Sequence, residues 1–137
     1  MHSNSWHKGT VLHGDKIGRT LGFPSANLSA ELVPKGTTPG VYHARVRIGS
    51  SHFSGVLYFG PRFSEGESHN SLEIHILDFN DDLYAQTIEF QLGAFIRPPL
   101  PFASTKEVIS QLTKDVTAIR AFYLSDQSQN DLSHTSK

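Results

Sequence analysis

The sequence has 137 residues, of which 37% are hydrophobic, enough for one domain with a single core and too few for two ordinary domains. Its 12 basic and 13 acidic residues give a formal net charge of -1, so overall charge attracts neither nucleic acid nor anionic lipid. There is no cysteine, no apolar run near the about 18 residues of a membrane span, and no secretory apolar segment in the polar start. We therefore expect a cytoplasmic protein without disulfides or thiolate chemistry.

The segment from 14 to 28, GDKIGRTLGFPSANL, contains three evenly spaced glycines. Gly14, Gly18 and Gly22 allow the backbone to adopt positive φ and to approach a ligand closely, and amide groups exposed in such turns can hold an anion. The same spacing is also typical of an ordinary glycine-rich turn between two strands. The pattern therefore predicts either a phosphate-binding turn or a plain connection.

Pro24 restricts the backbone directly after these glycines. It fixes its own φ and favours an extended conformation for Phe23, so the next residues should continue as an extended segment in which neighbours alternate sides. Ser25 and Asn27 then point the same way. Two neutral oxygen ligands beside a glycine-rich turn suit magnesium, a hard cation that is usually shared with substrate phosphates.

Residues 41 to 96 predict mostly β-strands. In 41–48 and 87–96 apolar residues recur at every second position, which is the period of a half-buried strand. The run 52–60 is apolar on both faces, so it predicts a central strand or one beneath a loop, and 72–79 predicts a further strand. Glycine and proline clusters separate these runs, and several short strands with turn signals favour a sandwich or a barrel over alternating β and α units. Of these we expect a mainly β fold, a closed, antiparallel, six-stranded Greek-key barrel.

The strand 72–79 carries the best candidate for a general base. Leu72, Ile74 and Ile76 share one face, which leaves Glu73 and His75 together on the other. A carboxylate there would be ionised near neutral pH and could accept a hydroxyl proton. The same pattern fits a solvated glutamate on an outward strand face, since glutamates are mostly exposed.

Residues 104–124 predict one helix packed on the barrel. Ser104 and Glu107 have the spacing of a capping box, and apolar residues follow at intervals of three and four, which gives one apolar stripe. We expect a single domain over residues 1–124. The polar residues 125–137 have little to bury, so we expect them to be disordered.

Two charged residues lie beside the apolar stripe of this helix. Asp115 and Arg120 are five residues apart, which places them about 140° apart around a 3.6-residue turn. They are therefore not stacked neighbours. From the residues alone they fit a surface acid and a surface arginine.

The order of residues in the glycine segment closely resembles the signature of the riboflavin kinase (flavokinase) family. The family carries a glycine-arginine pair, then glycine, an apolar residue and proline-threonine-alanine-asparagine; here 18–19 read GR and 22–27 read GFPSAN. Serine replaces threonine at Ser25, which keeps the hydroxyl. The resemblance continues through 40–42, 72–79, 82–84, Arg97, 114–116 and Arg120, and covers residues 9 to 123.

The resemblance implies transfer of the γ-phosphoryl group of ATP to the ribityl 5′-hydroxyl of riboflavin, with magnesium, to give FMN. Glu73 matches the family's catalytic base, and Ser25 and Asn27 match the residues that hold magnesium and phosphate oxygens. Nucleotide binding would also involve Gly14, Gly18, Arg19, Gly22 and Phe23. In the family the helix borders the flavin pocket, which implies flavin contacts for Arg120 and Asp115.

One departure from the family pattern falls in residues 61–71, a polar loop long enough to act as a flap. Many members have a proline-threonine pair after the third strand, whereas this chain reads Gly60-Pro61-Arg62-Phe63. Flavin affinity, flap closure or substrate range could therefore differ.

We expect riboflavin and ATP as the partners, with no nucleic acid and no membrane, and a monomer. Many bacterial relatives fuse the kinase to an FMN adenylyltransferase, so this chain could be fused to or associated with one. The alternative function is a noncatalytic barrel that binds a flavin or a nucleotide. A small oligonucleotide-binding barrel is a third candidate, which the near-neutral charge disfavours because such grooves are usually basic.

Overall fold

The computed structural model describes residues 5–12, 25–61, 70–79, 81, 83–100 and 104–135. These residues form strands β1 (His7–Thr10), β2 (Ser25–Leu28), β3 (Gly40–Ile48), β4 (Ser51–Pro61), β5 (Asn70–Ile76) and β6 (Thr87–Arg97). A short 3-10 helix, η1 (Ala30–Leu32), follows β2, and the long helix α2 (Thr105–Thr135) follows β6.

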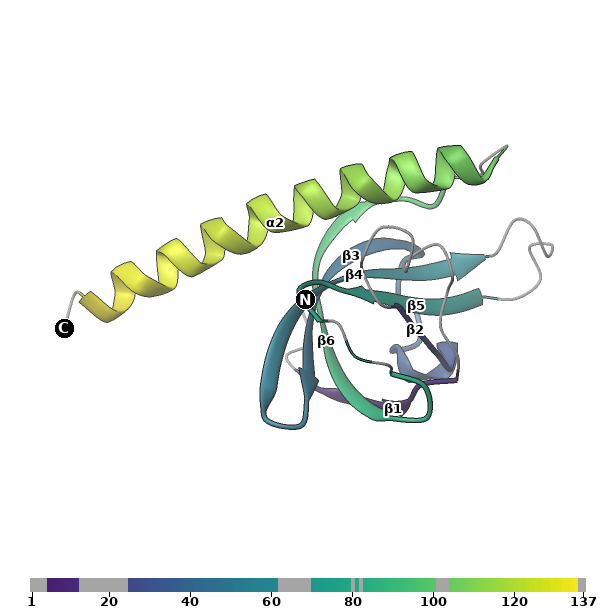
Figure 1. Ribbon diagram of the computed structural model, residues 1–137, viewed down its shortest axis with the longest axis horizontal. Helices are drawn as coiled ribbons and strands as arrows, with labels where there is room; N and C mark the ends of the chain where they lie inside the picture. The colour runs from purple at the N-terminus through teal and green to yellow at the C-terminus, as the bar shows by residue number, and fades with distance from the viewer. Residues whose placement is uncertain are drawn as a thin grey trace.

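The strands form one antiparallel sheet in the order β1-β6-β3-β4-β5-β2. The sheet curls into a barrel with α2 lying across one side of it (Figure 1). The strands β1 and β2 are the two edges of the sheet. The amide of Leu12, just after β1, donates a 2.8 Å hydrogen bond to the carbonyl of Asn27 in β2, so the two edges lie close together. The expected antiparallel barrel with one helix is confirmed, and the barrel is nearly closed.

The inside of the barrel holds the main hydrophobic core. Ala44 and Val46 of β3, Leu57 of β4, Ile74 of β5 and Phe90 of β6 are all fully buried in it. The predicted alternation therefore separates an inner apolar side from an outer side along β3 and the first part of β6. Ile96, predicted on the same side as Phe90, packs on the outer side instead, beyond the irregular register between β3 and β6.

A second apolar cluster lies outside the barrel, between its wall and α2. It consists of Val41, Val56, Leu77, Leu112, Val116 and Ile119. The apolar character of both faces of β4 follows from this arrangement, because Leu57 faces the barrel interior while Val56 faces the helix. The predicted apolar stripe of the helix packs into this cluster through Leu112, Val116 and Ile119, which are all buried.

Helix α2 begins as predicted and ends later than predicted. The hydroxyl of Ser104 accepts a hydrogen bond from the amide of Glu107, as an N-cap does. The helix runs to Thr135 rather than ending at Leu124, and it extends well beyond the barrel (Figure 1). No glycine or proline interrupts residues 104–137, so no helix-breaking residue follows Leu124. The structure thus assigns residues 125–135 to the helix, while the expected disorder of residues 125–137 and the domain boundary after residue 124 stay predictions.

Among the described residues, no helix combines the length and the apolar character needed to cross a membrane.

We predict that Ile119→Ala destabilises the fold by about 2–4 kcal/mol, because Ile119 is fully buried between α2 and the barrel and truncating a buried isoleucine leaves a cavity. Urea unfolding monitored by circular dichroism measures this loss. Lys114→Ala, an exposed change on the same helix, is the control. Equal stability of the two variants would contradict packing of α2 on the barrel.

Candidate active site

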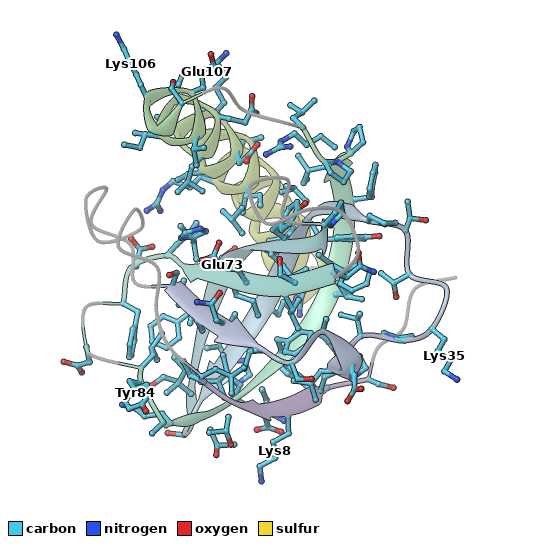
Figure 2. The ribbon with its side chains drawn as sticks, turned by 90° about the vertical axis from the view of Figure 1, so that its right-hand side faces the viewer. Lys8, Lys35, Glu73, Tyr84, Lys106 and Glu107 are labelled. Carbon is cyan, nitrogen blue, oxygen red and sulfur yellow. The ribbon has the colours of Figure 1, made fainter. Side chains whose placement is uncertain are left out.

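The candidate catalytic residues meet on the outer face of β2 and β5. The antiparallel register pairs Asn27 with Glu73 and Ser25 with His75. Since successive side chains of a strand point to opposite faces, and the intervening Ile74 is buried inside the barrel, these four residues share the outer face. Figure 2 shows Glu73 on this face, between α2 and β2.

The candidate site residues on this face are largely buried from solvent. The side chain of Glu73 is 13% exposed and that of His75 is 7% exposed, while Ser25 is 5% exposed. Lys8, Lys35 and Tyr84, by contrast, lie at the periphery of the molecule (Figure 2). The alternative of a solvated glutamate therefore does not describe Glu73.

Glu73 has an ionisable neighbour on its own strand. The Nε2 atom of His75 lies 3.4 Å from Oε1 of Glu73. The sequence placed both side chains on one face but did not indicate that they contact each other. The contact is possible because residues i and i+2 of a strand project from the same side.

The start of the predicted flap is fixed by β4 and β5. Pro61, the last residue of β4, pairs with Asn70, the first residue of β5, and the hydroxyl of Tyr58 donates a hydrogen bond to the carbonyl of Pro61 at 2.5 Å. Tyr58 is also the register partner of Glu73 on β4. The two ends of the flap are thus anchored beside the strand that carries Glu73.

Several predicted site residues lie outside the described part of the chain. Gly14, Gly18, Arg19, Gly22 and Phe23 fall in residues 13–24, and most of the predicted flap falls in residues 62–69. Their predicted roles in nucleotide binding and closure stay predictions.

Asp115 holds α2 to the end of β6. Its carboxylate accepts hydrogen bonds from Nε and Nη2 of Arg97 at 2.9 and 2.8 Å and from the Gln111 amide at 3.0 Å. Asp115 is 4% exposed, so this is a largely buried, bidentate ion pair of the kind for which arginine is best suited. The sequence did not predict this pairing, since Arg97 and Asp115 lie far apart along the chain.

Arg120 pairs with Asp78 and not with Asp115, which agrees with the predicted separation of Asp115 and Arg120 around the helix. Its guanidinium donates hydrogen bonds of 3.1 and 3.2 Å to the carboxylate of Asp78. Asp78 lies two residues after the end of β5, next to the buried Leu77. These hydrogen bonds lower the pKa of Asp78 and raise the pKa of Arg120. Arg120 is thereby held near the end of the strand that carries Glu73.

The described residues contain no group of three or more histidine, aspartate or glutamate side chains able to hold a metal ion. The hydroxyl of Ser25 and the amide oxygen of Asn27 are the neutral oxygen donors available on the outer face of β2.

The fold and this face define a small antiparallel barrel that presents a carboxylate, an amide and a hydroxyl together on its outer side. The Flavokinase family model, described as riboflavin kinase, matches residues 2–123. The chain therefore belongs to the riboflavin kinase (flavokinase) family, as the sequence motifs predicted.

Curated relatives carry this unit as part of a longer protein. The bifunctional riboflavin kinase/FMN adenylyltransferase of Listeria monocytogenes is 38% identical over 120 residues, which cover 85% of this chain and 37% of that protein. The protein of the same name from Haemophilus influenzae is 37% identical over 118 residues, with 84% and 37% coverage. The chain thus spans a little over a third of the length of these relatives.

Solved structures share the fold. The macrolide-efflux protein from Streptococcus pneumoniae superimposes with a TM-score of 0.68 at 30% identity, covering 84% of this chain and 38% of that chain. Riboflavin kinase from Trypanosoma brucei superimposes with a TM-score of 0.59 at 22% identity, covering 90% of this chain and 82% of that chain. The second likeness supports the barrel fold alone.

We predict that Arg120→Gln raises the pKa of Asp78 toward its ordinary value, because the arginine hydrogen bonds that lower it are lost. A depressed carboxyl pKa stabilises the fold above the unfolded-state pKa, and this contribution disappears as the pH falls through the folded-state pKa. Both side chains are substantially exposed, so the variant should lose less than about 1 kcal/mol at neutral pH.

A carboxyl carbon NMR titration of Asp78 measures this shift, and Lys114→Gln on the same helix is the control. An unchanged Asp78 titration in Arg120→Gln would show that the ion pair does not form in solution.

Proposed function

We propose that this chain transfers the γ-phosphoryl group of ATP to the ribityl 5′-hydroxyl of riboflavin, producing FMN and ADP. The main support for the proposal is the register of β2 and β5, which places Asn27 directly opposite Glu73 on the outer face of the barrel. Glu73 is largely buried there. Membership of the riboflavin kinase family supports the reaction and its substrates.

Glu73 is the proposed catalytic base. Its carboxylate accepts the proton of the 5′-hydroxyl while that oxygen forms its new bond to the γ-phosphorus. The bond from the γ-phosphorus to the oxygen bridging the β- and γ-phosphates breaks, and ADP leaves. Most of the acceleration in phosphoryl transfer comes from positioning and charge neutralisation, and a base adds about 10²- to 10⁴-fold.

Ser25 and Asn27 are the proposed magnesium and phosphate ligands. Their neutral oxygen donors fit a hard cation that keeps several waters and is shared with substrate phosphates, and serine supplies the same hydroxyl as the family's threonine. When bound, magnesium would neutralise charge on the transferring phosphoryl group. Ser25 and Asn27 sit on a strand paired with β5, so they hold this position rigidly relative to Glu73.

The remaining contacts divide between the two substrates. The amides around Gly14, Gly18 and Gly22, with Arg19 and Phe23, are proposed to hold the nucleotide. Arg120 is proposed to contact the flavin, since a planar guanidinium can stack on an aromatic ring system. Asp115 is also proposed to lie at the flavin-binding side, and its hydrogen bonds with Arg97 hold α2 to the end of β6 there.

We further propose that the FMN produced here is the substrate of an FMN adenylyltransferase, fused to this chain or associated with it, because the relatives combine both activities in their names. A cytoplasmic location and a monomeric state belong to the same proposal. No observation favours the noncatalytic flavin- or nucleotide-binding barrel or the oligonucleotide-binding barrel.

The direct test of this function is an assay for FMN with riboflavin, ATP and magnesium, resolved by chromatography. We expect FMN to form only when all three are present. Riboflavin binding without FMN formation under these conditions would support the noncatalytic alternative instead.

We predict that Glu73→Gln lowers kcat for FMN formation by about 10²- to 10⁴-fold, because the amide cannot accept the hydroxyl proton. Riboflavin affinity, measured by quenching of flavin fluorescence, should stay close to that of the wild type. Glu31→Gln, an exposed change in η1, is the matched control and should retain full activity. A near wild-type kcat for Glu73→Gln would remove Glu73 from the role of base.

A further inference from the structure

His75 is a buried ionisable residue of the candidate site. It lies near the end of β5, the strand that pairs with β2 on one side and with β4 on the other. Its side chain is only 7% exposed, and it projects on the same outer face as Glu73. Because the backbone is held from both sides, the imidazole is presented in a fixed position.

The two ring nitrogens of His75 have different surroundings. Nε2 lies 3.4 Å from Oε1 of Glu73, slightly longer than an ordinary N–H···O hydrogen bond. Nδ1 is buried and has no hydrogen-bond partner among the residues that the structure describes. Since Nε2 faces a carboxylate, the contact requires a proton on Nε2.

His43 shows what a structural histidine looks like in the same barrel. It is 3% exposed on the adjacent part of the wall, and its Nε2 lies 2.8 Å from the hydroxyl of Ser54. That ring makes a short contact with a neutral side chain. His75 instead lies beside the proposed base with a looser contact, and contacts to catalytic groups are often long before the substrates bind.

We propose that His75 is a positioning residue for Glu73: its Nε2–H donates to Oε1 and turns the carboxylate so that the other oxygen faces the 5′-hydroxyl of riboflavin. This inference rests on the proposed function. The imidazole neither takes the substrate proton nor binds a phosphate; it fixes the direction of the group that does the chemistry. A misplacement of about 1 Å at a reacting group can cost about 10²-fold in rate.

Two amide substitutions separate this role from simple packing. The side-chain amide of glutamine reaches the position of Nε2, whereas that of asparagine reaches only the position of Nδ1. We expect His75→Gln to keep kcat within about threefold of the wild type, and His75→Asn and His75→Ala to lose about ten- to a hundredfold. The KM values for ATP and riboflavin should stay within about twofold, because the substrate contacts lie elsewhere.

Thermal unfolding of the same variants identifies a merely structural effect. If kcat follows stability, so that asparagine and glutamine behave alike, His75 is a packing residue and the proposal is wrong. The proposal is equally overturned if His75→Ala keeps wild-type kcat, or if the loss appears in both KM values rather than in kcat.

A measurement independent of activity tests the contact itself. In a proton–nitrogen correlation spectrum of the wild-type chain, with the His75 signals identified by their absence in His75→Gln, we expect the proton on Nε2. In Glu73→Ala the ring should shift toward a mixture of the two tautomers. A wild-type ring protonated on Nδ1 would overturn the proposal even if the kinase activity is confirmed.

Failure of the proposed function would look different. A wild-type chain that makes no FMN while His75 still shows the Nε2 tautomer would contradict the reaction and with it the positioning role, but not the contact. An active wild type with an insensitive His75 would leave the reaction intact and contradict only the inference about His75.

Discussion

The antiparallel pairing of β2 with β5 is the constraint on which the rest of the structure depends. The same register places Ala26 and Leu28 opposite Ile74 and Leu72 inside the barrel and sets the polar side chains of both strands together outside. A slip by one residue would move every one of these side chains to the other face. The hydrophobic core therefore fixes the geometry of the candidate site, because it strongly selects a single register.

The helix α2 packs against the outside of the barrel near the candidate site (Figure 2). Its apolar residues cover Val41, Val56 and Leu77 outside the barrel, and the bidentate Arg97–Asp115 pair fixes it at the end of β6. Removing one partner of such a buried pair is costly because it leaves an uncompensated charge. This attachment also places Arg120 beside the end of β5. The packing of the helix on the barrel therefore sets the position of the proposed flavin contact.

Local sequence patterns predicted much of this fold. The period-two alternation of β3 and of the first part of β6, the two-sided apolar run of β4 and the apolar stripe of the helix correspond to observed packing. The alternation predicted for the end of β6 does not, because the register with β3 is irregular there. The pairing of Asn27 with Glu73, the Arg97–Asp115 ion pair and the contact of His75 with Glu73 could not be predicted, because they depend on tertiary register rather than on spacing along the chain. The structure extends the helix to Thr135, beyond the predicted end at Leu124, because low apolar content alone does not end a helix and no glycine or proline follows Leu124.

In the proposed reaction, the pairing of β2 with β5 makes Asn27 and Glu73 a single functional unit. A double-mutant cycle with Asn27→Ala and Glu73→Gln, measured by rapid-quench single-turnover formation of FMN at saturating riboflavin and ATP, tests it most directly. Residues that act together in one step show strongly non-additive losses. The account predicts that the double variant is far less impaired than the product of the two single losses. Losses that multiply would show that the two residues act independently and would contradict it.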